Sequence, residues 1–296
     1  CISNNGNGCS NAALFKVSPT AATFAWKLEL TSVAQAQRGS AYNDFSGLAI
    51  NSQGEIVASG TTYGSNVTLG SVLLSSSVDD TDAFLVKLNS AGNVMWTRVF
   101  SGKRFQYSNG VALDAQGNVY ILVTFENIVT IPSGLPNVAA TVLNSNGNTD
   151  VFVAKYNSTG ALLWVTQLGG NSVEVGKSIT VTTASGSNGS TNLVYVAGTF
   201  KLNTKMGSLS LNSNTALDTF ITAMDMGTGT VQWADRTDGD SSSEISVSEI
   251  FYMPNSTNSN FASLYMVGKF SSSMYTDLTD YKTSSSAVTS MFLWKR

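Results

Sequence analysis

The chain has 296 residues and a hydrophobic content of 42%, enough for a sizeable core in one large or two ordinary domains. Charged residues make up only 12%, about half of the usual ~25%, and the net charge is −3. A nucleic-acid-binding protein would show a basic face, which this sequence lacks, and no apolar run reaches the ~18 residues of a membrane-spanning helix.

The chain begins at Cys1, which is typical of a mature chain whose signal segment has been removed. A second cysteine, Cys9, follows after a loop rich in Asn and Gly. A disulfide between the two would fix the N-terminus and indicate an oxidising compartment. Two alternatives stay open: lipid modification of Cys1, which leaves Cys9 unpaired, and free thiols or bridges between subunits. We expect an extracellular or cell-surface protein.

Short apolar runs follow along the chain, separated every 8 to 12 residues by Gly, Asn and Ser. Runs of this length with such turn residues indicate β-strands, and no stretch of ten or more residues has a convincing helical period. In chain order, the expected strands cover residues 12–17, 24–30, 47–50, 56–60, 82–88, 94–100, 109–114, 119–125, 151–156, 162–168, 178–181, 193–198, 219–224, 231–237, 245–247, 264–268 and 291–296.

Four tryptophans divide the chain into copies of similar length. Trp26, Trp96, Trp164 and Trp233 lie at intervals of 70, 68 and 69 residues, each in the same local setting. Such a period indicates a tandem repeat, in which each unit is a small sheet that cannot bury both of its faces alone. About four strands per copy with non-helical connections favour an all-β fold, a β-propeller with four blades of about 69 residues each.

In such a propeller the repeated aromatic side chains pack between blades, and burial of each is worth on the order of 2–3 kcal/mol. An exposed aromatic platform for sugars is the alternative reading of the same residues. We assign inter-blade packing to Trp26, Trp96, Trp164, Trp233, Phe84, Phe152, Phe220 and Phe292.

The second copy carries a specific likeness in residues 82–88, 92–96, 109–114 and 117–120, and residues 150–170 repeat part of it. These segments resemble the bacterial seven-bladed β-propeller repeat family, and the likeness covers nearly the whole chain after Asn11. The resemblance implies a secreted or surface protein, often an adhesive module, with no shared catalytic residues. The chain departs from the family in having four long copies, and an eight-bladed ring built from two chains is an alternative.

Two kinds of strand recur along the chain. The first kind, here called the Phe strand, occurs five times and is marked by Leu14, Phe84, Phe152, Phe220 and Phe292. The second kind, the Trp strand, contains the repeated tryptophan and occurs four times. If a blade runs from a Trp strand to the next Phe strand, four blades fill residues 23–296 as a single domain, and residues 1–22 form an N-terminal extension. The strand left over consists of Ala12, Ala13, Leu14, Phe15, Lys16 and Val17. This strand can close the ring inside the molecule, or it can pair with the open edge of a neighbour and build a head-to-tail filament.

The chain contains no histidine, which removes Ser-His-Asp and Cys-His catalysis and His-based zinc sites. No phosphate-binding glycine loop is present. We therefore assign no catalytic residue and expect no cofactor. Asp82, Asp150 and Asp218 begin equivalent strands and are expected to cap a repeated turn. The acidic loop with Asp235, Asp238 and Asp240 is a weak candidate for Ca²⁺, since it lacks the full EF-hand spacing.

Four Asn-x-Ser/Thr sequons lie in expected loops, at Asn66, Asn157, Asn188 and Asn255, where a glycan would be tolerated. Taken together, the sequence favours a structural protein that associates with itself, the repeating subunit of an extracellular fibre formed by head-to-tail strand pairing. A lectin-like or adhesive propeller that binds glycans or proteins is the alternative. An enzyme that acts on carbohydrate through two carboxylates is the third, although no pair can be nominated from the sequence.

Overall fold

The protein folds entirely into β-strands and turns wherever its structure is described. The computed structural model describes residues 12–18, 20–21, 23–31, 43–63, 66–74, 80–182, 192–213, 216–239, 241–253, 263–271, 274–276 and 290–295. Those ranges contain 22 strands and no helix, and hence no helix that could cross a membrane. The expectation of an all-β fold is confirmed.

Three antiparallel sheets repeat the same four-stranded order. The second sheet of the chain has the order β3 (Asn43–Ile50), β4 (Ile56–Tyr63), β7 (Thr81–Leu88) and β8 (Val94–Lys103). The third sheet has the order β9 (Gln106–Leu113), β10 (Val119–Ile131), β11 (Thr141–Tyr156) and β12 (Leu162–Leu168). The fourth sheet has the order β13 (Glu174–Val181), β14 (Leu193–Phe200), β17 (Asp218–Asp225) and β18 (Val231–Asp238).

The first and last sheets contain fewer strands of this pattern. At the N-terminal end, β1 (Ala13–Val17) pairs with β2 (Phe24–Thr31) as an antiparallel hairpin. At the C-terminal end, β19 (Ile245–Met253), β20 (Ser263–Phe270) and β22 (Ser290–Lys295) form a three-stranded sheet. The hairpin corresponds to the last two strands of a complete sheet, since Lys16 pairs with Trp26 as Lys87 pairs with Trp96.

Short strands pair with the edge strands β2, β12 and β18. The hairpin of β5 (Thr68–Leu69) and β6 (Val72–Leu73) extends from β2, and β21 (Tyr275–Thr276) pairs with β18. The hairpin of β15 (Asn203–Met206) and β16 (Leu209–Asn212) contacts β12 through the pair Leu168 and Met206. A further bridge joins the second and third sheets, because the end of β10 pairs with the end of β8.

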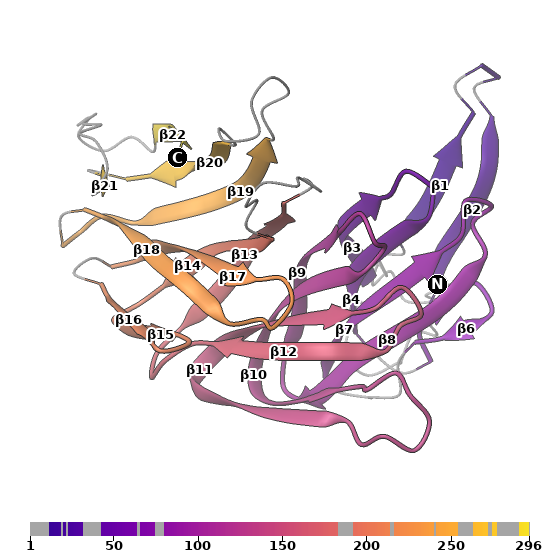
Figure 1. The fold of residues 1–296 in the computed structure, drawn as a ribbon, viewed down its shortest axis with the longest axis horizontal. Coiled ribbons are helices and arrows are strands. Elements are labelled where there is room, and N and C mark those ends of the chain that lie inside the picture. The colour runs from indigo at the N-terminus through magenta and orange to yellow at the C-terminus, as the bar shows by residue number, and fades with distance from the viewer. Residues whose placement is uncertain are drawn as a thin grey trace, which may run out of the picture.

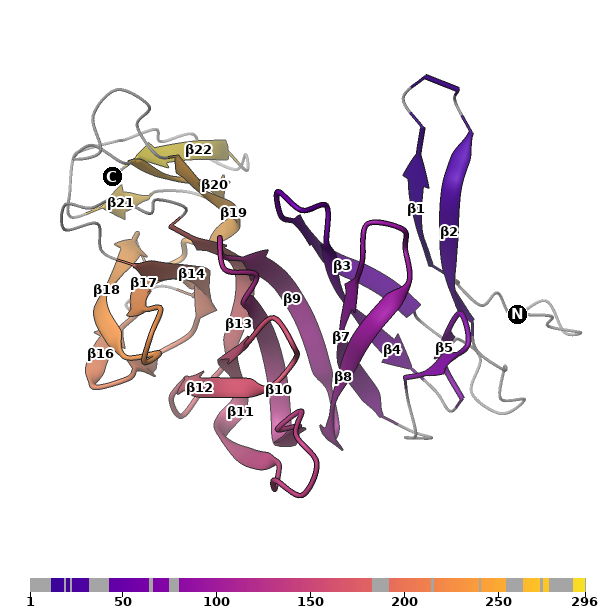
Figure 2. The ribbon, with the colours of Figure 1, turned by 45° about the vertical axis from the view of Figure 1, so that its right-hand side comes forward.

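The five sheets follow one another in a curved row from the β1–β2 hairpin to the β19–β20–β22 sheet (Figures 1 and 2). In both views the two end sheets stand apart. The core lies between consecutive sheets rather than inside any of them. Four hydrophobic clusters fill the four junctions, and Ile179 of β13, for example, packs with Leu122 of β10.

The turns explain why the chain reverses where it does. Asn89 accepts hydrogen bonds from the backbone N–H groups of Ala91 and Asn93, and Asn157 does the same for Thr159 and Ala161. An Asn or Asp at this place mimics part of a backbone turn. The glycine that follows adopts a positive φ, 84° at Gly92, which few other residues tolerate.

Two boundaries expected from the sequence differ in the structure. A sheet begins at β3 and ends at its Trp strand β8, so the Trp strand closes a sheet instead of opening one. The expected boundary between residues 22 and 23 lies between two paired strands, because β1 is bonded to β2. An alternating pattern identifies a strand but not its hydrogen-bond partner. The expected repeat therefore began one strand too early, at the Trp strand that in fact closes the preceding sheet.

Candidate interaction surface

Consecutive sheets are joined by a recurring contact at a turn. Lys87 of β7 and Trp96 of β8 both donate to the carbonyl oxygen of Ser158 in the next sheet, over 3.2 and 3.1 Å. The buried ammonium group of Lys87 also lies 3.0 Å from the carboxylate of Glu55, and this hydrogen bond lowers the pKa of Glu55. One carbonyl thus receives two donors, and a charged partner balances the buried lysine.

The next junction repeats this contact. Lys155 and Trp164 donate to the carbonyl oxygen of Met226 over 2.7 and 3.1 Å. Burial lowers the pKa of Lys155, and the negative charges of Asp114 and Asp225 oppose that shift. A glycine makes room for the indole, since a Cβ on Gly229 would lie 2.6 Å from Cε3 of Trp164.

The N-terminal junction has a weaker form of the same contact. Lys16 donates to the carbonyl oxygen of Ser90 over 3.4 Å. Gly92 again leaves room for an indole, since its Cβ would lie 2.5 Å from Cδ2 of Trp26. The indole N–H of Trp26 is buried without a hydrogen-bond partner among the described residues. The hairpin therefore docks on the second sheet with fewer hydrogen bonds of this kind than those that join the second, third and fourth sheets.

One face of β3 is exposed where equivalent strands are covered. Leu48, Val111, Ile179 and Ile250 occupy equivalent positions in β3, β9, β13 and β19. The last three are between 2% and 8% exposed because the preceding sheet packs on them, whereas Leu48 is 54% exposed and Ile50 beside it 61%. The exposed pair faces the place where, in the described part of the chain, the first sheet has no inner strands.

The C-terminal sheet presents the complementary face. Phe251 and Met253 on β19 are 47% and 57% exposed. Ala112, which occupies the equivalent position to Phe251 in β9, is only 8% exposed and packs with the following sheet. The last sheet in the row thus exposes the face that, in the preceding sheets, packs against the next sheet.

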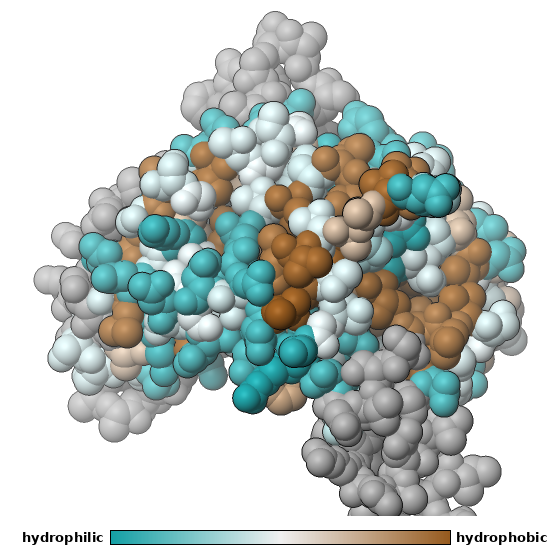
Figure 3. Space-filling model, turned by 90° about the horizontal axis from the view of Figure 1, so that it is seen from below, coloured by the Kyte–Doolittle hydropathy of each residue, from teal (hydrophilic) through white to brown (hydrophobic). Residues whose placement is uncertain are grey.

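The β1–β2 hairpin also has an uncovered side. Phe15 and Phe24 are half or more exposed and meet edge to face, with ring centroids 5.0 Å apart. Val17 beside them is exposed as well. The equivalents of Phe15 and Val17 in β7 are Val86 and Leu88, which are fully buried. Several apolar patches appear on the face shown in Figure 3, and Leu163, Leu135 and Leu202 are also exposed, so the two ends are distinguished by exposure relative to equivalent positions.

Two strand edges are open at the same ends. Within the described residues, β1 pairs with β2 alone and β22 with β20 alone, whereas their counterpart β7 lies between β4 and β8. An unpaired edge presents unsatisfied N–H and C=O groups that can bond to another strand. We define the end faces as Leu48, Ile50, Phe15, Val17, Phe24, Phe251 and Met253, together with these two edges.

The four tryptophans lie at the four junctions, each packed with a different hydrophobic cluster. Phe84, Phe152 and Phe220 are fully buried, and the side chain of Phe292 lies outside the described part. The expected assembly strand, residues 12–17, is β1 with Ala12 before it. The structure thus separates residues that hold the sheets together from residues that are exposed at the two ends.

Other sequence-derived candidates are dispersed. Cys1, Cys9, Asn188, Asn255 and Asp240 lie outside the described residues, as does the side chain of Asp238. Asn66 is exposed in a turn with a positive φ of 56°. Asn157 uses its carbonyl oxygen within its turn, and Asp235 accepts from the N–H of Arg236.

The end faces were not found from the sequence, because Leu48 and Val111 look alike in their copies. Only the strand pairing, which shows where each sheet begins and ends, reveals that Leu48 has no preceding strands packed on it as Val111 has. Asp82, Asp150 and Asp218, expected to cap turns, are all fully buried. Asp218 lies 3.5 Å from Nη1 of Arg236.

Comparison with known proteins agrees with a repeat architecture. No family model matches the chain. It is similar to an uncharacterised WD repeat-containing protein of Acanthamoeba polyphaga mimivirus, with 33% identity over 99 residues. The match covers 33% of this chain and 7% of the viral protein. The similarity and the all-β sheet array together support a repeat protein of the β-propeller kind.

Proposed function

We propose that the protein is a structural subunit that associates with itself head to tail at the cell surface or outside the cell. In this arrangement the β1–β2 hairpin of one copy continues the β19–β20–β22 sheet of the next. The observation that carries the proposal is the match between the two ends, each of which presents, among the described residues, a strand edge without a partner beside an uncovered apolar face.

The strand order supports the join. A complete sheet has four strands, the hairpin corresponds to its last two, and the C-terminal sheet corresponds to its first three. Placing them edge to edge gives a five-stranded sheet, one strand more than a complete sheet, in which β22 lies beside β1 and each open edge gains hydrogen bonds. A contact between two different surfaces does not close on itself unless its rotation forms a ring, so it extends into a filament.

The side chains support the join as well. The end faces would meet as consecutive sheets meet inside the chain, with Phe251 directed toward Leu48 and Ile50. Full burial of each such side chain is worth about 1.5–3 kcal/mol. The net charge of −3 opposes the approach of two copies only weakly. The secreted setting is supported by the resemblance to surface propeller repeats.

Closure within one chain would use the same faces and would make a four-bladed ring. Molecular mass separates the two arrangements, so we would measure mass by light scattering over a range of concentrations and examine the same samples by electron microscopy. We expect mass to rise with concentration and filaments to appear. A constant monomer mass with no filaments at the highest concentration would overturn the proposal.

Leu48→Asp places a charge in the proposed contact and should lower self-association at least tenfold. Leu163→Asp is the matched control, because Leu163 on β12 is 53% exposed but lies in the third sheet, away from both ends. Equal behaviour of the two variants would place the association elsewhere on the molecule.

A second candidate function, glycan binding, is favoured by one observation. Phe105 and Tyr107 are 41% and 44% exposed and stack with centroids 5.8 Å apart and planes 16° apart. Arg104 and Glu126 form an ion pair nearby at 3.5 Å. Exposed rings beside polar groups suit a sugar ring, which has apolar faces and polar edges. Retention of the chain on immobilised oligosaccharides, and its loss in Tyr107→Ala, would test this candidate.

A further inference from the structure

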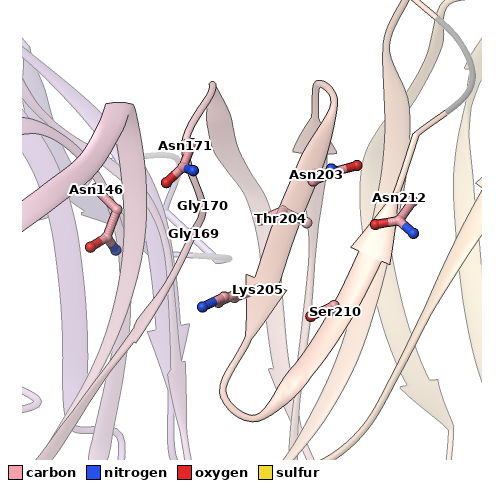
Figure 4. A pocket seen from close by; sticks show the side chains of 9 residues that line it. All are labelled: Asn146, Gly169, Gly170, Asn171, Asn203, Thr204, Lys205, Ser210 and Asn212. Atoms are coloured by element: carbon pink, nitrogen blue, oxygen red, sulfur yellow. The ribbon is translucent and has the colours of Figure 1, made fainter.

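A polar pocket of about 360 Å³ lies between the end of β12 and the β15–β16 hairpin. Figure 4 shows Asn146 and Asn171 on one side and Asn203, Lys205 and Asn212 on the other. Gly169, Gly170 and Thr204 also line the pocket. The lining is rich in amide and hydroxyl oxygens and, among the described residues, contains no aromatic ring.

Glu174, the first residue of β13, lies behind this lining. Its side chain is fully buried, and neither carboxylate oxygen has a hydrogen-bond partner among the described residues. The hydroxyl oxygen of Thr204 is in the same condition, with Thr204 1% exposed. Three buried side-chain oxygens at one place are therefore unsatisfied, which is rare in folded proteins and costly unless a ligand is present.

A second buried carboxylate lies beside the first. Asp150 is fully buried, and a Cβ on Gly169 would lie 2.4 Å from its Cγ, so the carboxylate packs directly behind the pocket. Asn146 donates to Asp150 through its side-chain amide over 2.8 Å, and Gln167 does so over 2.5 Å. The backbone N–H of Asn146 also donates to Asp150, over 3.2 Å, and because all of these donors are neutral, no positive charge among them balances the two acids.

At equivalent positions in other sheets, the charge of the buried aspartate has different partners. Arg236 faces Asp218 in the fourth sheet, and Gln167 occupies the place of that arginine in the third, since each pairs with the phenylalanine two residues after the aspartate. Glu174 stands where β9 begins with Gln106. At this junction the chain has a neutral side chain where the fourth sheet has an arginine, and an acid where β9 has an amide.

The electrostatics agree with the geometry. Burial raises the pKa of Glu174 to about 7, and the charge of Asp150 adds to the rise. The N–H of Gly170 and the hydroxyl of Thr204 oppose it without forming a hydrogen bond of ordinary geometry. Burial also raises the pKa of Asp150. Lys205 is the positively charged side chain among the pocket residues, and it lies on the exposed hairpin.

From this geometry we infer that Asp150, Glu174 and Thr204 form a binding site for a divalent cation of the size of Ca²⁺. Across the described ranges no group of three or more His, Cys, Asp or Glu side chains gathers, so neutral oxygens must complete the coordination. Ca²⁺ accepts such mixed oxygen ligands, including amide and backbone carbonyls and water. The Asn-rich lining of the pocket supplies candidates.

Two other uses of this acid pair are less well supported. A carbohydrate-cleaving pair must contact its substrate from both sides of a bond. Here both carboxylates are buried behind Gly169 and Gly170. A shared proton would relieve part of the charge, and the protonated carboxyl group could donate to the hydroxyl of Thr204, so the calcium titration below distinguishes the two. A cation satisfies all three oxygens and would connect the third sheet to the β15–β16 hairpin.

The test uses the full chain, stripped with EDTA, and CaCl₂ as the probe. We expect one Ca²⁺ per chain at this site by isothermal titration calorimetry at pH 7.5, with a higher melting temperature and binding at least tenfold weaker at pH 5.5, where protons compete. Glu174→Gln and Asp150→Asn should abolish both binding and the thermal shift. Asp235→Asn is the control and should retain both.

Glu174→Gln introduces the amide that β9 already carries at this place, so loss of folding is not expected, and circular dichroism would verify it. If the wild-type chain ignores CaCl₂ and its stability varies only with pH, the acid pair holds a proton and the cation site is refuted. If Glu174→Gln binds Ca²⁺ as the wild type does, the site lies elsewhere and the inference is equally refuted.

Discussion

Leu48 on β3 and Val111 on β9 occupy equivalent places in consecutive sheets, yet the first is 54% exposed and the second 8%. The difference comes from their neighbours, because the second sheet covers Val111, whereas the described residues of the first sheet include no inner strand in front of Leu48. The same amino-acid pattern therefore gives a buried core residue in one repeat and a solvent-exposed apolar residue in another.

Truncation at equivalent positions should have unequal costs. Ile179→Ala removes a side chain that is 8% exposed and should lower the free energy of unfolding by about 2–5 kcal/mol. Leu48→Ala should change it by less than ~0.5 kcal/mol in dilute solution. Urea denaturation monitored by tryptophan fluorescence measures both. Similar losses would show that Leu48 is covered within a single chain, as in a closed ring.

Glycines at one turn should also differ. Gly229→Ala places a Cβ 2.6 Å from Cε3 of Trp164 at a φ of +72°, so we expect a loss of about 2–4 kcal/mol. Gly227→Ala, two residues earlier, meets only the carboxylate oxygen of Asp225 at 3.2 Å and should cost less than ~1 kcal/mol. Thermal unfolding of the two variants side by side tests whether the tryptophan contact is tight.

Stability should depend on pH through Glu174. The pKa of this group is about 7 in the folded chain, above its value of 4.5 when unperturbed, so the folded state holds the proton more tightly. Stability is then greatest below pH 4.5 for this group, falls as the pH rises to 7, and is lower above that by roughly 3 kcal/mol.

Glu174→Gln should remove this dependence and raise stability at pH 8. Denaturation midpoints at pH 5 and pH 8 in EDTA provide the measurement, since a bound cation would mask the effect. An unchanged pH dependence in Glu174→Gln would mean that another group titrates.

Supplying a positive side chain should replace the proposed cation. Gln167→Arg copies into the third sheet the partner that Asp218 has in the fourth. We expect this variant to be more stable than the wild type in EDTA and to lose most of its response to CaCl₂. Gln167→Met, of similar length but neutral, is the control. A calcium response that survives in Gln167→Arg would contradict the assigned charge balance.

Local features of the fold were accessible from the sequence. The strands around Trp26, Trp96 and Trp164 and the turns at Asn89 and Asn157 follow from apolar runs and from Asn and Gly chemistry. The phase of the sheets was not accessible, because an alternating strand does not specify its hydrogen-bond partner. The correspondence of the hairpin to the end of a sheet became visible only through the pairing of Lys16 with Trp26.

The proximity of the two buried acids was not predicted from the sequence, for a related reason. Asp150 and Glu174 are brought together by the bridge between Thr149 and Val173, a contact between two sheets that no local pattern encodes. A signal did exist in the comparison of copies, in which Gln106 of β9 corresponds to Glu174 of β13. An acid that replaces an amide at a buried repeat position marks a place where the copies have diverged in charge.

The contact of Lys16 with Ser90 is longer than its counterparts, and the indole N–H of Trp26 has no acceptor within the described part of the chain. The N-terminal hairpin is consequently held by fewer hydrogen bonds of this kind than those that join the second, third and fourth sheets. Its amide protons should exchange with solvent before those of the inner sheets do. If a second copy binds at this hairpin, as proposed above, its strand could pair there without disturbing the inner sheets.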